Sequence, residues 1–445
     1  MSYPKIILNK RARRLFFGFL VLIFFVSTPI LVMYTIGYRY DWQTNRILET
    51  GVISIDAEPR DANVFLSNVH ITKRLPFRLT NRAPGTYNLR IEKTGYKTWS
   101  KNIDVSSKQT TYIKNISLLK DALPVPVFSN NERDIKEIKS SPDGSYIIII
   151  SAKDNIEIIE LFNTQTKEIH TISRLPLSIK SNTQWSPFDN SILITAQRKD
   201  AISLTVISAS NPDAPKAYSI TKDSGENYFQ WQKDAPTPTL FTRDGNYLIK
   251  LTLNERKNIH SIKKTDKWYI DTKEKLWLYK DNIISLKSSN DPRDSIAITN
   301  NQSIKKIIDI NEQRIILLAD KNIFIIPRDS DDQLESINAT SFVFNPATKE
   351  YIVWSPWELW SIYEHNQPAL LNRTSDNMIS VFPLDDVGAL LVANSDKLIA
   401  FNPGYYISQE LFYGEIKSAS VNHKTKTIYF LGKVGEKEDL FELEY

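Results

Sequence analysis

Six aspartates recur at nearly even intervals through the last two thirds of the chain, and their type and spacing could support chemistry. They are Asp154, Asp200, Asp244, Asp281, Asp320 and Asp396. Each precedes the apolar position of a recurring strand-like segment by two or three residues. A ring of such carboxylates would attract a cation or a basic partner. The alternative is turn chemistry, because Asp-Asn and Asp-Gly are favoured hairpin pairs and Asp bonds its own backbone.

A tryptophan takes the place of the aspartate in one of these segments. The run is Trp354-Ser355-Pro356-Trp357-Glu358-Leu359-Trp360. If strands hold Trp354 and Trp360, Trp357 lies on a turn near solvent. An exposed indole there could stack on a sugar ring or anchor a protein partner. Packing against a neighbouring segment explains the residue equally simply, so Trp357 and the six aspartates are the candidate binding residues.

Linear signatures of catalysis are missing from the sequence. The five histidines, His70, His170, His260, His365 and His423, lie about 60 to 105 residues apart, which excludes the close pairs of zinc sites. The chain has 13 glycines and no cysteine, and it shows neither a phosphate-binding loop nor a nucleophile elbow. The run from Asp329 to Asp332 lacks the glycine and the distal glutamate of a calcium loop. We therefore expect a protein that is not an enzyme, without catalytic residues, metal or cofactor.

The elements that must position the candidate residues repeat about every 41 residues. One strand-like segment serves as a ruler, and its apolar position falls at Ile156, Ile202, Tyr247, Ile283, Ile323, Leu359, Leu398 and Leu440. Further short strands surround it: in the first unit these are 135–139, 146–150 and 168–172. Four antiparallel strands per unit are typical of a β-propeller blade. The period predicts an eight-bladed propeller over residues 127–445, with seven blades as the alternative count.

The two ends of the repeating region are predicted to meet. The last unit stops after its third strand, and the segment from Val125 to Ser129 is an unused strand after the proline-marked linker at 121–126. Pairing of the two would close the ring and remove two open sheet edges. The turn Ser141-Pro142-Asp143-Gly144, with Trp185-Ser186-Pro187 and Asn345-Pro346 as degenerate echoes, resembles the strand-connecting turn of WD-type propellers.

A smaller β domain precedes the propeller, over residues 51–120. Short strands alternate there, with Tyr87, Leu89 and Ile91 facing inward, and Pro84-Gly85 suits a type II turn. The succession Gly51-Val52-Ile53-Ser54-Ile55, Pro59-Arg60-Asp61-Ala62-Asn63-Val64-Phe65, Leu75-Pro76-Phe77, Pro84-Gly85-Thr86-Tyr87 and Gly95-Tyr96-Lys97-Thr98-Trp99 resembles the PEGA domain. Two turns depart from the family pattern, at Asp61 and at Ser67-Asn68. The resemblance implies a non-catalytic envelope module that acts as a spacer or binds the cell wall.

An uncharged apolar run follows five basic residues at the N-terminus. The predicted transmembrane helix covers 15–38, after a basic tail at 1–14 and before a juxtamembrane segment at 39–50. The basic tail places the N-terminus in the cytoplasm and the remaining domains outside it. Tyr34, Tyr38, Tyr40 and Trp42 mark the outer interface. The run is too long for a signal peptide, so we expect an uncleaved single-pass anchor.

Charge excludes one class of partner. The five basic residues before the span equal the whole formal charge of +5, so the exported part is balanced. A nucleic-acid partner is not expected, because phosphate contacts require a surplus of Lys and Arg.

The composition suggests a bacterial cell envelope. We interpret the chain as an all-β, extracytoplasmic binding or scaffold protein for an unknown protein or envelope glycan. The alternatives are an extracytoplasmic hydrolase or lyase acting on glycans at the propeller channel, and an assembly factor that binds extended peptide strands.

Overall fold

The computed structural model describes residues 10–41, 46–128, 134–222, 228–233, 235, 237–263, 267–289, 294–298, 303–328, 335–345, 348–363 and 367–445. Some residues considered above lie outside this part of the chain: Lys5, Trp42, Ser129, Asp329 to Asp332, Pro346 and His365. The chain divides into two compact units, Met1–Ala122 and Leu123–Tyr445.

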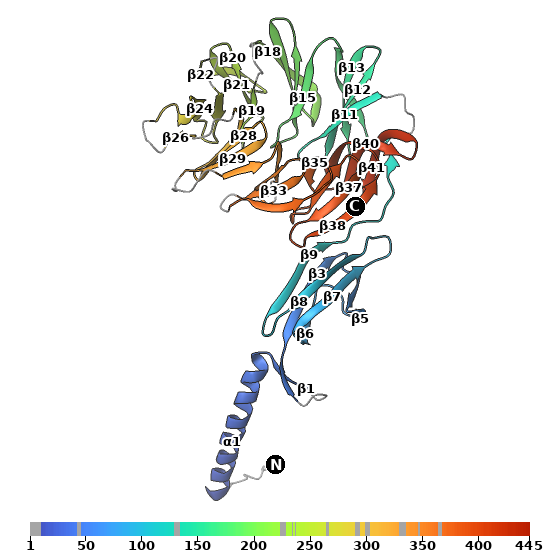
Figure 1. The fold of residues 1–445 in the computed structure, drawn as a ribbon, viewed down its shortest axis with the longest axis vertical. Coiled ribbons are helices and arrows are strands. Elements are labelled where there is room, and N and C mark those ends of the chain that lie inside the picture. The colour runs from blue at the N-terminus through green and yellow to red at the C-terminus, as the bar shows by residue number, and fades with distance from the viewer. Residues whose placement is uncertain are drawn as a thin grey trace, which may run out of the picture. The chain divides into compact units, whose positions relative to one another are not determined.

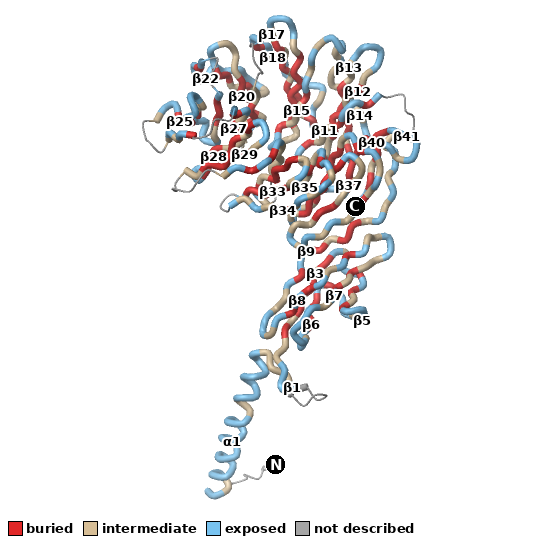
Figure 2. Tube along the Cα trace, in the orientation of Figure 1, coloured by how far each residue is buried: buried red, intermediate tan, exposed pale blue. Residues whose placement is uncertain are grey.

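The N-terminal apolar run forms helix α1 (Lys10–Thr35), and the colouring of Figure 2 shows that most of its residues are exposed. Within the described residues, α1 alone is long and apolar enough to span a membrane, a property that signal sequences share. The helix ends three residues before the predicted span does, because Gly37 adopts a φ of +99° beyond its last turn. The juxtamembrane segment then forms a hairpin of β1 (Tyr38–Asp41) and β2 (Arg46–Glu49).

The rest of the first unit is a two-sheet sandwich. Its strands are β3 (Gly51–Glu58), β4 (Asn63–Leu66), β5 (Val69–Ile71), β6 (Phe77–Arg82), β7 (Gly85–Glu92), β8 (Trp99–Val105) and β9 (Thr110–Ser117). One sheet has the order β6-β3-β9, in which β3 and β9 are parallel, and the other has the order β5-β4-β7-β8. Leu89 and Ile91 are buried as predicted, whereas Tyr87 is half-buried. Ser67 and Asn68 both take positive φ, so the departure from the family pattern preserves a tight turn.

The described residues of the second unit form eight four-stranded antiparallel sheets, which we number as blades 1 to 8 (Figure 1). Blade 1 comprises β11 (Asp134–Ser140), β12 (Tyr146–Lys153), β13 (Ile156–Asn163) and β14 (Ile169–Pro176). Blade 2 comprises β15 (Ser181–Trp185), β16 (Ser191–Gln197), β17 (Ala201–Ser208) and β18 (Asn211–Thr221). Blade 3 comprises β19 (Phe229–Trp231), β20 (Thr239–Asp244), β21 (Tyr247–Thr252) and β22 (Arg256–Ser261). Blade 4 comprises β23 (Lys267–Ile270), β24 (Leu276–Lys280), β25 (Ile283–Leu286) and β26 (Ser295–Ala297).

The remaining blades follow the same order of pairing. Blade 5 comprises β27 (Ile304–Ile310), β28 (Arg314–Ala319), β29 (Asn322–Pro327) and β30 (Glu335–Asn338). Blade 6 comprises β31 (Ser341–Asn345), β32 (Glu350–Trp354), β33 (Glu358–Tyr363) and β34 (Ala369–Arg373). Blade 7 comprises β35 (Met378–Pro383), β36 (Leu390–Asn394), β37 (Lys397–Asn402) and β38 (Ile407–Tyr413). Blade 8 comprises β39 (Ile416–Asn422), β40 (Thr427–Val434), β41 (Lys437–Glu444) and β10 (Val125–Pro126). Every ruler position lies in the third strand of its sheet.

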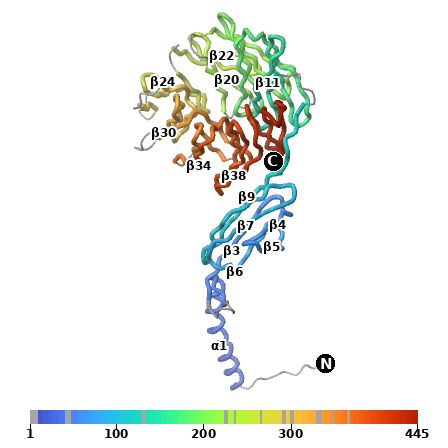
Figure 3. The backbone as a smooth tube through the Cα atoms, turned by 45° about the vertical axis from the view of Figure 1, so that its right-hand side comes forward, coloured from blue at the N-terminus to red at the C-terminus, as the bar shows by residue number. Residues whose placement is uncertain are grey.

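The first strand of the second unit completes the last sheet, as predicted. Val125 pairs with Glu442 and Pro126 with Phe441, and the Val127 amide donates to the Leu440 carbonyl at 2.9 Å. Val125 and Pro126, which the sequence analysis also included in the linker, therefore belong to the propeller. The last strands lie beside the first blade in both views (Figures 1 and 3), where β11 contacts β39 and β40. Contacts between blade 8 and blade 1 therefore close the ring together with the strand pairing inside blade 8.

Candidate functional site

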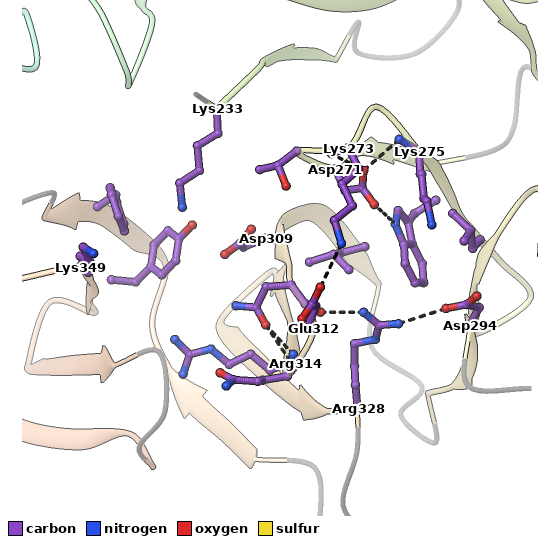
Figure 4. A pocket seen from close by; sticks show the side chains of 18 residues that line it. Lys233, Asp271, Lys273, Lys275, Asp294, Asp309, Glu312, Arg314, Arg328 and Lys349 are labelled. Carbon is purple, nitrogen blue, oxygen red and sulfur yellow. Dashed lines mark hydrogen bonds and ion pairs between the residues drawn. The ribbon is translucent and has the colours of Figure 1, made fainter. Parts of the chain in front are cut away.

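A pocket of about 870 Å³ opens where the first turns of blades 4, 5 and 6 approach one another (Figure 4). Its wall includes the turn between β23 and β24, the turn between β27 and β28, and residues flanking the turn between β31 and β32. Lys233, from the corresponding turn of blade 3, completes the wall on one side. The placement of successive blades beside one another therefore brings together four segments that are distant in sequence.

Side-chain caps shape the two central turns. The Asp271 carboxylate accepts hydrogen bonds from the amides of Lys273 and Lys275, both at 2.9 Å, and from Trp277 Nε1 at 3.0 Å. In the next blade, Asn311 Oδ1 accepts from the amides of Gln313 and Arg314, both at 2.9 Å. Asp and Asn fold turns in this way because their short side chains reach amides a few residues ahead.

Arg328 connects the two turns at the wall of the pocket. Its Nη2 lies 3.1 Å from Asp294, its Nη1 donates to the Asn311 carbonyl at 2.7 Å, and its guanidinium lies 4.9 Å from the Trp277 ring centroid. The Arg328 side chain is only 14% exposed. Charge-assisted hydrogen bonds are stronger than neutral ones, so Arg328 links blades 4 and 5 at this wall of the pocket.

Two carboxylates at the pocket have charged or phenolic partners. Lys273 Nζ lies 3.0 Å from Glu312, and its hydrogen bond lowers the pKa of Glu312 and raises that of Lys273, so both are charged at neutral pH. Both side chains are largely exposed, which makes this pair weak. Deeper in, the Tyr269 hydroxyl donates to Asp309 at 3.2 Å. Burial raises the pKa of Tyr269, so the phenol remains a neutral donor.

Three lysines of the pocket have no carboxylate partner among the residues that the structure describes. Lys233, Lys275 and Lys349 line the wall, and none forms an ion pair with a described residue. The ammonium of Lys233 lies 5.0 Å from the Phe344 ring centroid. Among the described residues, the lining holds six Lys or Arg side chains and four Asp or Glu side chains. The described part of the lining consequently carries an excess of positive charge.

The six predicted aspartates lie where the second strand of each blade leads into the third: five are on the turn itself, and Asp244 is the last residue of β20. Asp154-Asn155 and Asp281-Asn282 both take positive φ at each residue, as a type I′ turn requires. Asp244 accepts a hydrogen bond from the Thr221 amide at 2.8 Å and pairs with Arg256, and Asp320 pairs with Lys305 at 3.0 Å. Asp154, Asp200, Asp281 and Asp320 are exposed, whereas Asp244 and Asp396 are half-buried.

The structure does not gather these aspartates. In the described part of the chain, no three His, Asp or Glu side chains come close enough to hold a metal ion. The aspartates also lie at the opposite strand ends from the pocket: Arg314 begins β28, whereas Asp320 follows its end. Six residues of strand separate the two by about 20 Å. Their binding role stays a prediction, and the turn role is what their geometry supports directly.

Trp357 lies on the turn between β32 and β33 and is 51% exposed. This is the position expected from strands that hold Trp354 and Trp360. Its carbonyl accepts from the Thr374 amide at 3.0 Å, which fixes the turn. Like the aspartates, it lies at the end of the blade away from the pocket, and its binding role stays a prediction.

The pocket residues were not identified from sequence. A usable signal was present, because Lys233, Lys273, Arg314 and Lys349 lie in or directly after the first turn of successive units, at intervals of about 40 residues. Charged residues in loops are usually solvated surface, so this signal has no meaning until the ring brings the turns together.

Residues 50–118 match the family model of the PEGA domain. This match confirms the resemblance found in the sequence for the first β domain. No curated protein matches the chain.

Several solved structures are similar to this chain at low identity. Kluyveromyces lactis Hsv2 aligns with a TM-score of 0.38 and 10% identity over 64% of this chain and 100% of that one. An oligogalacturonate lyase from Vibrio parahaemolyticus aligns with a TM-score of 0.41 and 10% identity over 72% of this chain and 92% of that one. The WD40 domain of SCAP from fission yeast aligns with a TM-score of 0.40 and 10% identity over 73% of this chain and 98% of that one. Likeness at this level does not transfer an activity or a partner.

Proposed function

We propose that the chain is a membrane-anchored protein that acts outside the cytoplasm and recognises an envelope ligand with the propeller pocket, without transforming it. In this proposal α1 is an uncleaved anchor, the PEGA domain is a spacer or wall-binding module, and the propeller is the binding platform. The contacts of Arg328 that link blades 4 and 5 favour recognition by a rigid surface.

The observation that carries the proposal is the state of the pocket carboxylates. A glycan hydrolase needs a carboxylic acid whose pKa is raised so that it can donate a proton. Here the pKa of Glu312 is lowered, Asp294 pairs with Arg328, and Asp271 is occupied by turn amides. Glu312 therefore stays ionised and the other two carboxylates are held by structural partners, which favours binding over acid-base catalysis.

Edge strands weigh against recognition by strand addition. The longest outer strand is β18, and it contains Pro212 and Pro215. Proline lacks the amide that an added strand would need, so this edge is protected from pairing.

The proposal can be tested by photo-crosslinking in intact cells that make the full chain. A photoreactive residue at Gln313, in the pocket wall, should capture an envelope component, whereas one at Asp213, on exposed β18, should not. The captured component should be intact. Capture from both positions alike would contradict recognition by the pocket. A shortened component that becomes intact in a Glu312→Gln or Asp309→Asn variant would establish the enzyme instead.

A further inference from the structure

The lysines without carboxylate partners indicate the charge of the ligand. Lys273 and Arg328 are neutralised by Glu312 and Asp294, but Lys233, Lys275 and Lys349 are not neutralised by any described residue. They come from blades 3, 4 and 6, so their presence at one pocket depends on the placement of successive blades. Ammonium groups that share a recess repel one another, and an anion placed among them relieves that repulsion.

The rest of the lining indicates what kind of anion fits. Thirteen of the eighteen lining residues are polar or charged, and Thr272, Asn311 and Gln313 add hydroxyl and amide groups. An acidic peptide segment would also bring apolar side chains, which need apolar recesses. The lining provides few of these. An acidic carbohydrate chain, by contrast, carries many hydroxyl groups and regularly placed acidic groups.

An aromatic pair forms one side of the pocket. Phe344 and Tyr351 both line it, with ring centroids 5.0 Å apart, and both are half-buried. Aromatic rings present an apolar face beside polar groups, which suits the carbon face of a sugar ring. The ammonium of Lys233 lies against Phe344, so a cation stands next to this face (Figure 4).

We propose that the pocket binds an acidic glycan, with Lys233, Lys275 and Lys349 contacting its anionic groups and the Phe344–Tyr351 wall contacting its sugar rings. This inference rests on the proposed binding function of the same pocket and specifies its ligand. Lysine suits this task as a point charge that can follow anions at different positions along a flexible chain. Because the lysines are partly or fully exposed, binding weakens as salt increases.

The test measures binding of a uronic acid hexasaccharide to the detergent-solubilised full chain by calorimetry. The triple variant K233Q/K275Q/K349Q should bind at least about tenfold more weakly, which corresponds to about 1.4 kcal/mol. Replacement of the same three lysines by arginine should retain binding, because the charge is kept. Lys216→Gln, on the exposed face of β18, is the matched control and should leave binding unchanged. An unchanged midpoint of thermal unfolding shows that the triple variant is folded.

Three further probes decide the ligand class. Maltohexaose, a neutral chain of equal length, should bind at least tenfold more weakly than the uronic acid chain. Poly-L-glutamate or inorganic phosphate binding as tightly as the acidic sugar would overturn the glycan assignment. Failure of every acidic probe, or equal binding by the triple glutamine variant, would overturn the inference. If crosslinking at Gln313 still captures a neutral component, the binding function stands and only the ligand class is wrong.

Discussion

Asn422 Nδ2 donates a hydrogen bond of 2.7 Å to the hydroxyl of Thr164, a residue 258 positions earlier in the chain. Asn422 ends β39 in blade 8, and Thr164 follows β13 in blade 1, so the bond joins the last blade to the first. Both residues are 2% exposed. The Thr164 hydroxyl in turn contacts the carbonyls of Gly144 and Ser145 at 3.1 and 2.9 Å. Ring closure thus includes a buried polar network as well as strand pairing.

Replacing Asn422 by alanine should destabilise the propeller by about 2–4 kcal/mol, because the change leaves buried polar groups without partners. The side chain also caps its own turn, since Asn422 Oδ1 accepts from the amides of Lys424 and Thr425 at 2.9 and 3.2 Å. Denaturant unfolding of the full chain, followed by tryptophan fluorescence, measures the loss. Asn254→Ala, at an exposed turn of blade 3, should stay within about 0.5 kcal/mol of wild type. Equal effects from the two variants would show that the network adds nothing to closure.

Gly144 is predicted to be the least tolerant glycine at the ring junction. A Cβ there would lie 2.3 Å from the Val421 carbonyl oxygen and 2.4 Å from Asn422 Cα, at a φ of +67°. Gly144→Ala must displace the backbone of blade 8, and we expect a loss of at least about 3 kcal/mol in the free energy of unfolding.

Gly245 offers a matched control for that substitution. Its φ is +59°, but nothing lies within 4 Å of an added Cβ. Gly245→Ala should therefore cost only the backbone strain, about 1 kcal/mol. The difference between the two alanine variants isolates the packing of blade 1 on blade 8. If Gly245→Ala costs as much as Gly144→Ala, strain alone explains both and the contact is unimportant.

Asp143 should make the junction sensitive to acid. Burial raises its pKa, but hydrogen bonds from the Ser145 amide at 3.0 Å and from Lys424 at 2.9 Å outweigh burial, so the pKa lies well below its usual 3.8. A carboxylate whose pKa is lower in the folded than in the unfolded protein stabilises the fold at pH values above the unfolded-state pKa. This stabilisation is lost as the pH falls through the folded-state pKa.

The expected signature is a pH-dependent difference from Asp143→Asn. At pH 7 wild type should be more stable by about 1–2 kcal/mol, a modest value because the pair is partly screened by solvent. The difference should narrow steadily as pH falls below about 4. Asp213→Asn, on exposed β18, should match wild type throughout. A constant difference between the wild-type and Asp143→Asn proteins would mean that the carboxylate charge is not what stabilises the turn.

The strands could be predicted from sequence because each is decided locally. The continuous apolar run from Ile323 to Ile326, for example, places apolar side chains on both buried faces of β29 and needs no knowledge of the ring. The closing strand was also predictable, because an unused strand and an incomplete sheet are both visible in the sequence. The parallel pairing of β3 with β9 was not, because hairpin signals describe only neighbours in the chain.

The pocket could not be predicted because its residues become neighbours only through the ring. Lys233 and Lys349 are separated by more than two complete blades, and neither lies in a motif. The aspartates were more conspicuous in sequence because turn chemistry imposes Asp at the same strand end in successive blades. Regular spacing therefore directed attention to the aspartate turns, whereas the charges that line the pocket lie on the turns at the opposite strand ends.

Removal of the closing strand should open the propeller. Deleting 125–128 removes the pairing of Val125 with Glu442 and the contact between Phe128 and Phe162, whose ring centroids lie 6.1 Å apart. Deleting 441–445 removes the other partner, together with the hydrogen bond from the buried Tyr445 hydroxyl to the Leu384 carbonyl at 2.7 Å. Each deletion should lower the midpoint of thermal unfolding by at least about 5 °C and expose edges that promote aggregation. An unchanged midpoint and a monomeric protein after both deletions would refute closure by this strand.

The final prediction concerns membrane topology, because every proposal for the pocket requires the propeller to lie outside the cytoplasm. The basic residues that precede and begin α1 should hold the N-terminus inside, so protease added to intact cells should cut the propeller and leave the helix protected. The protein should also keep the mass of the uncleaved chain before treatment. Its exposed turns, such as that at Tyr406, which is 70% exposed, offer cleavage sites. Cutting only after lysis would place the propeller inside or behind a further barrier. A shorter protein released from the membrane would identify α1 as a signal sequence, and either result would require a different source for the ligand.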